Sequence, residues 1–282
     1  MRTPLVVAAI LLATLGTGCA ATPGSSPSAP SSPTHIPSPS PSPSQSSPAT
    51  EFPTPTSSKR PTDPGTPPVA KGVGPAGSIV TTGSEAVALT FDDGPWPEYT
   101  PLLLDLLKAY NVKATFCVIG KQALAYPELI RRIYDEGHTF CNHSWRHDID
   151  LRLRGDSAIR DDLNATIRAI HDAAPLAQIS YFRAPGGNFD DGLVNICRSM
   201  GMTPLYWYVD TRDWEYTKYT YGTAMVDNIV TRVERDSRRG SIILSHDKGK
   251  PDTVTAYQTL LPWLKQHYQL IALPADGKLP RP

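Results

Sequence analysis

Short apolar runs alternate with longer amphipathic segments between Ala86 and Ala272. The short runs are rich in β-branched and aromatic residues and are bounded by glycine, proline or polar residues, a pattern typical of buried strands. These runs predict strands at Val87–Phe91, Ala114–Ile119, His138–Asn142, Ser180–Arg183, Thr203–Val209, Ser241–Ser245 and Gln269–Ala272.

The amphipathic segments between these runs predict helices. Two of them begin with proline, which is favoured in the first turn of a helix. The predicted helices are Pro101–Ala109, Pro127–Glu136, Ser157–Ala173, Asp191–Met200, Thr223–Arg235 and Thr253–Gln266. Strict alternation of strands and helices favours a parallel sheet or barrel with the helices outside. Seven strands and six helices suit a small, irregular α/β barrel better than a complete eightfold barrel.

The chain begins with a basic residue, an apolar run from Leu5 to Leu15, and the small residues that precede Cys19. This order predicts an export signal over residues 1–19, because the apolar run is too short for a membrane-spanning helix. Gly18-Cys19 resembles a bacterial lipobox, in which the cysteine is lipidated, although Gly16 departs from that pattern. We therefore expect a cell-surface lipoprotein, with plain secretion as the alternative.

Residues 20–77 consist mostly of serine, proline, threonine and alanine. Such a composition cannot bury a core and favours extended conformations, so we predict a disordered spacer followed by one globular domain over residues 78–282. Lys plus Arg and Asp plus Glu balance at 27 each, and no basic patch argues for nucleic acid as a partner. A membrane would be reached only through a lipid on Cys19, and we expect a monomer.

Three cysteines lie in the predicted domain. Cys117 and Cys141 occupy similar depths in two consecutive predicted strands, so a disulfide between them is compatible with export. The sequence leaves the pairing open, because Cys197 is also present.

Polar residues follow five of the predicted strands, where the active residues of α/β barrels gather. The first strand runs into Asp92-Asp93-Gly94-Pro95, and the third into Asn142-His143-Ser144-Trp145-Arg146-His147. Histidines four residues apart lie on one face of a helical turn, so we expect His143 and His147 on such a turn. Two histidines and one carboxylate suit Zn²⁺ or a related divalent metal and leave coordination positions open.

Further polar residues follow the fourth, fifth and sixth predicted strands. Arg183 arrives where two carboxylates need charge compensation, and the Pro185-Gly186-Gly187 turn offers backbone N–H groups as oxyanion donors. His246 follows the sixth strand. A buried aspartate beside such a histidine would raise its pKa and favour a role as proton donor.

The order Thr90-Phe91-Asp92-Asp93-Gly94-Pro95, His143-Ser144-x-x-His147, Arg183-x-Pro185, Asp213-Trp214 and Leu244-Ser245-His246 resembles the polysaccharide deacetylases of carbohydrate esterase family 4. The resemblance spans roughly Ala86 to Ala272 and implies a distorted seven-stranded (β/α) barrel. It also implies a hydrolase of carbon–nitrogen bonds outside peptides.

The resemblance implies that Asp93, His143 and His147 bind the metal, which is expected to be zinc, with cobalt or nickel as alternatives. Asp92 is implied to be the general base, and Arg183 is implied to hold Asp92 in place.

The resemblance further implies that His246 protonates the departing amine and that Asp213 orients His246. The backbone N–H of Gly186 is implied to bind the oxyanion, while Trp214 and Leu244 form the walls of the acetyl pocket. Many family members carry an aromatic residue at the position of Gly186, so this difference concerns substrate preference.

We therefore expect deacetylation of N-acetylglucosamine residues in a cell-surface polysaccharide, first of all peptidoglycan, because an anchored domain would lie near the cell wall. Chitin oligosaccharides and acetylxylan are alternatives, the latter as an O-deacetylation. A catalytically inactive, lectin-like wall-binding protein is an expectation of a different class. The presence of Asp92, the three metal-ligand candidates and His246 argues against it, because binding alone needs no proton donor.

Overall fold

The computed structural model describes residues 68–280. The predicted export signal, Cys19 and most of the predicted spacer lie outside these residues, so their assignment stays a prediction. Within the described part of the chain, none of the helices combines the length and apolar character needed to cross a membrane.

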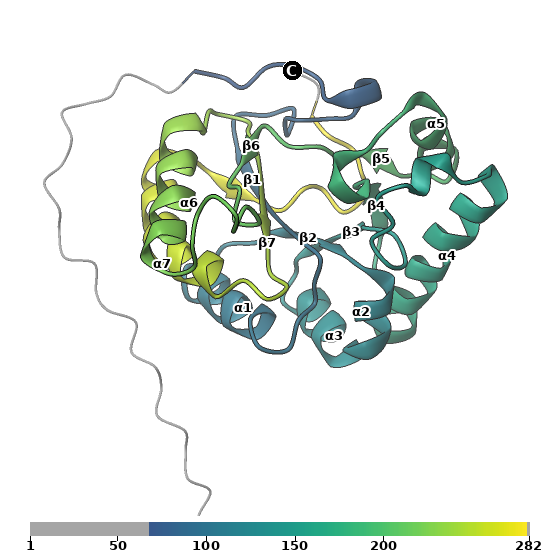
Figure 1. The fold of residues 1–282 in the computed structure, drawn as a ribbon, viewed down its shortest axis with the longest axis horizontal. Coiled ribbons are helices and arrows are strands. Elements are labelled where there is room, and N and C mark those ends of the chain that lie inside the picture. The colour runs from purple at the N-terminus through teal and green to yellow at the C-terminus, as the bar shows by residue number, and fades with distance from the viewer. Residues whose placement is uncertain (1–67, 281–282) are drawn as a thin grey trace, which may run out of the picture. The chain divides into compact units, whose positions relative to one another are not determined.

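Short parallel strands form one curled sheet at the centre of the described fold (Figure 1). The strands are β1 (Val87–Asp92), β2 (Thr115–Val118), β3 (Thr139–Asn142), β4 (Ile179–Phe182), β5 (Thr203–Pro204), β6 (Val209–Asp210), β7 (Ile242–His246) and β8 (Leu270–Ile271). Their order is β5-β4-β3-β2-β1-β7-β6, and β8 pairs with β1. The sheet thus forms a half-barrel, and its two end strands, β5 and β6, are not paired with each other in the described residues.

Helices surround the sheet on its outer side (Figure 1). They are α1 (Thr100–Ala109), α2 (Gly120–Ala125), α3 (Pro127–Asp135), α4 (Asp156–Ala173), α5 (Asp191–Ser199), α6 (Thr223–Asp236) and α7 (Pro251–His267). All six predicted helices are confirmed within one or two residues at each end. The six-residue helix α2 has no counterpart in the prediction, because it is too short to show helical periodicity.

Alternation along the strands separates an outer core from an inner one. In β1, Val87, Leu89 and Phe91 pack with the helices in the large core, whereas Ala88 faces the inner cluster that contains Cys117 and Cys141. Because side chains in a strand alternate with a period of two, Thr90 and Asp92 share the inner face with Ala88. The sheet therefore presents Asp92 to the inside of the half-barrel at the end of β1.

The predicted strand Thr203–Val209 is wrong as a single element. Its beginning pairs with β4 as β5, its end pairs with β7 as β6, and the chain between them crosses from one sheet edge to the other. Ile79 lies beside this crossing, where its N–H donates to the Pro204 carbonyl and its own carbonyl accepts the Tyr206 N–H. The crossing interrupts the strand because its two ends have different partners.

Candidate functional site

The ends of β1, β3, β4, β6 and β7 surround a cavity of about 320 Å³. Eight of the ten residues predicted for the site in the domain line it, together with Ala184, Gly187, Trp207 and Asp210. These eight are Asp92, Asp93, His143, His147, Gly186, Trp214, Leu244 and His246. The other two, Arg183 and Asp213, are buried behind the cavity and contact Asp92 and His246. The prediction that strand ends converge is therefore confirmed.

The adjacent carboxylates of Asp92 and Asp93 both reach His143. The Nε2 atom of His143 lies 3.7 Å from Asp92 Oδ2 and 3.5 Å from Asp93 Oδ1. Asp93 has a φ of 79°, the left-handed region that non-glycine residues rarely adopt, although aspartate tolerates it better than most. This backbone turn ends β1 and directs the second carboxylate towards the histidines.

The two histidines meet through tight turns and not on a helical turn. Ser144 and His147 have φ values of 64° and 60°, so the prediction of a helical turn is wrong. The His147 N–H donates to Ser144 Oγ at 3.0 Å, which closes the turn. The two imidazole rings then lie edge to face with centroids 5.0 Å apart. A local hydrogen bond and left-handed backbone angles, and not a helical turn, therefore bring the two histidines together.

Asp93, His143 and His147 form an arrangement suited to a divalent metal. Their ligand atoms lie within 4.8 Å of one another. The His143 Nδ1–H donates to the Arg183 carbonyl at 2.8 Å, which leaves the lone pair of Nε2 facing Asp93 Oδ1. His147 Nε2 lies 3.5 Å from the same oxygen, which is buried without a hydrogen-bond partner. A cation between these atoms would satisfy all three.

Electrostatics favour the ligand-competent protonation state at Asp93 and His147, whereas at His143 the carboxylates of Asp92 and Asp93 outweigh burial and raise the pKa. Burial raises the pKa of Asp93, but the neighbouring histidines outweigh burial and bring this pKa well below its usual range. Burial and the charge of His143 lower the pKa of His147. An ionised carboxylate and a neutral imidazole are the forms that bind metal.

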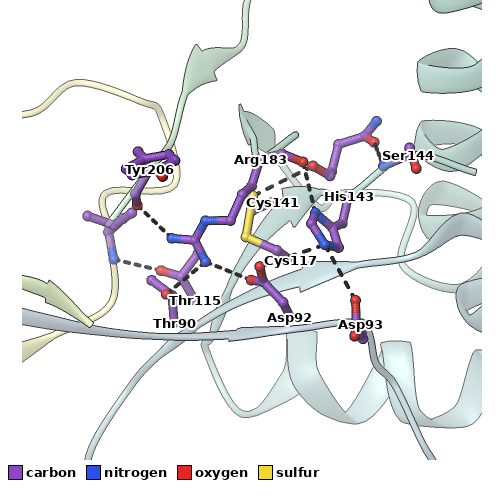
Figure 2. The surroundings of a disulfide bond; sticks show 12 residues. Thr90, Asp92, Asp93, Thr115, Cys117, Cys141, His143, Ser144, Arg183 and Tyr206 are labelled. Atoms are coloured by element: carbon purple, nitrogen blue, oxygen red, sulfur yellow. Dashed lines mark hydrogen bonds and ion pairs between the residues drawn. A yellow bond between two sulfur atoms is a disulfide. The ribbon is translucent and has the colours of Figure 1, made fainter. Parts of the chain in front are cut away.

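Arg183 fixes Asp92 from behind the cavity (Figure 2). This side chain is fully buried, and its Nη1 donates to Asp92 Oδ1 at 2.6 Å and to Thr90 Oγ1 at 2.9 Å. Its Nη2 donates to the Tyr206 carbonyl at 2.9 Å. With one oxygen held in this way, Asp92 keeps its Oδ2 near His143.

The disulfide between Cys117 and Cys141, which the sequence left open, is present beneath this group (Figure 2). The two residues face each other in the register of β2 and β3, and both are fully buried. The bridge therefore ties together the two strands that lead to α2 and to His143. Cys197 is a free, buried cysteine.

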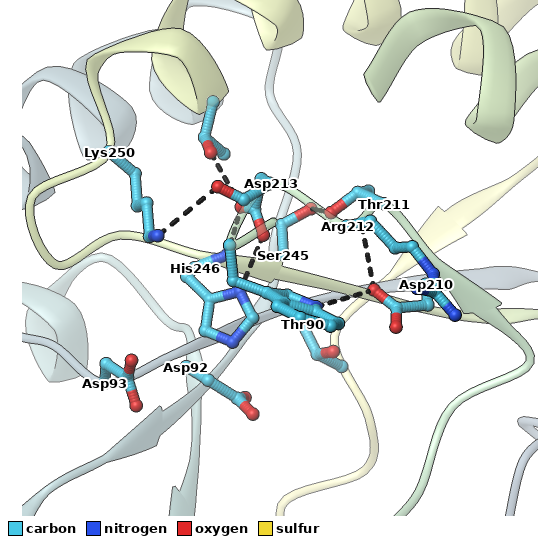
Figure 3. Close-up of polar contacts among 12 residues, drawn as sticks. Thr90, Asp92, Asp93, Asp210, Thr211, Arg212, Asp213, Ser245, His246 and Lys250 are labelled. Atoms are coloured by element: carbon cyan, nitrogen blue, oxygen red, sulfur yellow. Dashed lines mark hydrogen bonds and ion pairs between the residues drawn. The ribbon is translucent and has the colours of Figure 1, made fainter. Parts of the chain in front are cut away.

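His246 and Asp213 form a hydrogen-bonded pair at the end of β7 (Figure 3). The Nδ1–H of His246 donates to Asp213 Oδ1 at 2.7 Å, and the His246 backbone N–H donates to Asp213 Oδ2 at 2.8 Å. Thr253 Oγ1 also donates to Oδ2, at 2.7 Å. Burial lowers the pKa of His246, but the Asp213 carboxylate outweighs burial and raises this pKa to about 9. The imidazole is thereby held as an acid at neutral pH.

Leu244, Trp214, Trp207 and Gly186 supply the apolar part of the cavity lining. Gly186 has a φ of 63°, a backbone conformation that a side chain there would strain. A Cβ atom at this position would meet the Asn188 side chain at 3.4 Å. The cavity lining therefore carries no side chain at this position.

Four residues near the site had no role in the sequence interpretation. Trp207 and Asp210 line the cavity, Lys250 donates to the Asp213 carbonyl at 3.3 Å, and Asp247 accepts a hydrogen bond from Thr100 at 2.6 Å. Asp210 lies at the end of a strand, and this position could have identified it as a candidate site residue from the sequence. Trp207 was hidden inside the single predicted strand that the structure divides.

Comparisons with known proteins found similar sequences and structures. Residues 79–205 match the family model described as polysaccharide deacetylase. The chain is 38% identical to a chitooligosaccharide deacetylase of Sinorhizobium fredii, over 65% of this chain and 87% of the relative. It is 34% identical to a peptidoglycan-N-acetylglucosamine deacetylase of Bacillus cereus, over 69% of this chain and 89% of the relative.

A solved structure of a family pseudoenzyme from Bacillus anthracis is also similar. Its TM-score is 0.62 and its identity 30%, with coverage of 71% of this chain and 67% of that one. Likeness in fold alone therefore does not separate active from inactive members, and the separation depends on the residues of the site.

Proposed function

Because the chain belongs to the polysaccharide deacetylases of carbohydrate esterase family 4, we propose that it hydrolyses the acetamide of N-acetylglucosamine residues in a cell-surface polysaccharide, with the help of a divalent metal ion. The observation that carries this proposal is the convergence of a metal-ligand trio, a clamped carboxylate and a protonated imidazole on one cavity.

Asp93, His143 and His147 would hold the metal, and nitrogen and carboxylate ligands suit zinc first, with cobalt or nickel as alternatives. When bound, such an ion supplies Lewis acidity, which polarises a carbonyl group and lowers the pKa of water. The unpartnered Asp93 Oδ1 supports the assignment, because a buried carboxylate oxygen without a partner is otherwise unfavourable.

The proton transfers are assigned to Asp92 and His246. Asp92 accepts a proton from the water that attacks the acetyl carbon, and Arg183 holds the carboxylate in its orientation. His246 donates a proton to the sugar nitrogen as the carbon–nitrogen bond breaks, and acetate and the amine leave. Asp213 holds the imidazole with Nε2 towards the cavity. The backbone N–H of Gly186 is assigned to the carbonyl oxygen, whose negative charge grows during attack.

Peptidoglycan is the proposed first substrate. The B. cereus relative is named for this polymer, and a lipid on Cys19 together with the proline-rich spacer would keep the domain near the wall. The S. fredii relative is named for chitooligosaccharides, which makes these oligomers the main alternative. Acetylxylan would be attacked at an ester by the same groups.

A panel of acetate-release assays tests the proposal. We expect acetate from peptidoglycan, less from chitin oligosaccharides or acetylxylan, loss of release with a chelator, and recovery with Zn²⁺ or Co²⁺. A wild-type protein that binds one of these glycans yet releases no acetate with either metal would favour an inactive binding protein.

A further inference from the structure

Asp210 places an unassigned carboxylate in the wall of the cavity (Figure 3). It ends β6, and its Oδ1 accepts the Arg212 backbone N–H at 2.8 Å and the Trp214 Nε1–H at 3.3 Å. One oxygen is thus fully used in holding the loop and the indole ring that follow it.

The second oxygen of Asp210 has no comparable partner. Within the described residues, Oδ2 accepts no hydrogen bond, and the carboxylate takes part in no ion pair. This atom is also not sealed from solvent, since it is absent from the fully buried side-chain atoms that have no partner. Oδ2 is therefore a free acceptor on a residue that lines the cavity.

The surroundings of Asp210 suit a sugar ring. Trp207 and Trp214 line the same cavity, and aromatic faces beside a few fixed polar groups are typical of sites that orient a small ligand. Burial, with a smaller contribution from the charge of Asp213, outweighs the hydrogen bonds from Arg212 and Trp214 and raises the pKa of Asp210. A hydroxyl donor would satisfy it.

The position of Asp210 in the sheet separates its carboxylate from the acetamide nitrogen that His246 is proposed to protonate. Asp210 pairs in register with Leu244, two residues before His246, the residue assigned to the departing amine. Because Asp210 lies level with a residue two positions before the proton donor, we expect its carboxylate beside the sugar ring and not at the carbon–nitrogen bond that breaks.

We propose that Asp210 is a specificity-determining residue, whose Oδ2 accepts a hydrogen bond from a hydroxyl of the sugar that carries the acetamide, while its Oδ1 holds Trp214. This inference rests on the proposed function, because it names the contact that selects a sugar over another acetylated compound.

The variant Asp210→Asn tests the proposal while keeping one acceptor oxygen for Arg212 and Trp214. The value of kcat/KM is measured with N-acetylglucosamine oligomers and with 4-nitrophenyl acetate, which has no sugar. The ratio of the two values is expected to fall about tenfold, mainly through KM, because the neutral amide removes a charge-assisted acceptor. The matched control Trp214→Phe keeps Oδ2 and should lower both values together.

Oligomers lacking single ring hydroxyls identify the contact. On one of these deoxy substrates, wild type and Asp210→Asn should become equal, because the donor is already absent. An unchanged ratio in Asp210→Asn, or an equal effect of this variant on every deoxy substrate, would overturn the proposal.

Failure of the Asp210 proposal can be distinguished from failure of the proposed deacetylase function. A wild-type protein without acetate release contradicts the deacetylase assignment alone. The Asp210 contact is then read from the Kd for the same oligomers, which Asp210→Asn should raise about tenfold if the contact exists and leave unchanged if it does not.

Discussion

The variant Asp213→Asn tests the origin of the acidity of His246. Burial alone would lower the pKa of this histidine, and the Asp213 carboxylate, 2.7 Å from Nδ1, is the main group that raises it from 6.5 to about 9. That rise corresponds to ~3 kcal/mol of preference for the charged imidazole. An asparagine preserves an acceptor for Nδ1–H but removes the negative charge.

The sign of the pH dependence follows from this raised pKa. Because the folded protein holds the proton more tightly than the unfolded chain, the stabilising contribution of His246 is complete below pH 6.5 and is lost as pH rises through about 9. A proton donor is also active only while it is protonated, so the alkaline limb of kcat/KM reports the same group. A bound divalent cation would repel the imidazolium, so we expect the wild-type limb below 9.

The assay is acetate release by wild type and Asp213→Asn between pH 5 and 10, with saturating Zn²⁺. We expect the alkaline limb of the variant to move towards acid by about one pH unit or more, with about a tenfold loss at pH 8. The matched control is Thr253→Val, which removes the hydrogen bond from Thr253 to Asp213 Oδ2 but keeps the charge. An alkaline limb that stays in place in Asp213→Asn, with normal metal content, would refute the assignment of His246 as the proton donor.

Three further variants test other parts of the site. Asp92→Asn should lose turnover by about 100-fold or more while metal content, measured by atomic emission, stays normal; full activity would contradict the role of general base. Arg183→Met leaves Asp92 buried without its cation and should lower the free energy of unfolding in urea by ~3 kcal/mol, whereas an equally stable variant would show that Asp92 is held by other contacts. Replacing both Cys117 and Cys141 by serine should lower the same free energy by ~3 kcal/mol, because the bridge closes a loop across 24 residues; no change in unfolding would count against its formation.

Much of the fold could be predicted because local pattern and global arrangement agree. The spacing of apolar residues, together with the glycine, proline and polar residues that bound each run, located six helices and six of the seven predicted strands. The rule that active residues follow parallel strands places Asp92, His143, Arg183 and His246 together from the sequence alone. The meeting of these residues was predictable because strands that alternate with helices run parallel, so that their carboxyl ends lie at the same edge of the sheet.

Other features depend on contacts that no local pattern contains. The crossing between β5 and β6 serves two sheet edges and is held by Ile79, more than a hundred residues away in sequence. The His147 turn needs a left-handed φ of 60° at a residue that is not glycine, so helical spacing was the wrong guide. The free oxygen of Asp210 became visible only once the partners of its other oxygen were known.

The adjacency of Asp92 and Asp93 acquires a physical explanation from the backbone. Neighbouring side chains in a strand point to opposite faces, so two adjacent carboxylates in a regular strand would be separated by the sheet. The strand ends between them: Asp92 keeps the inner face of β1, while the left-handed φ of 79° at Asp93 turns its carboxylate back to the same histidine. An unusual backbone angle at a non-glycine residue has a cost of order 1–3 kcal/mol, and such angles are retained where a site requires them. The strain at Asp93 is therefore what allows one carboxylate to be clamped by Arg183, in the position proposed for the general base, while its neighbour faces the histidines as a proposed metal ligand.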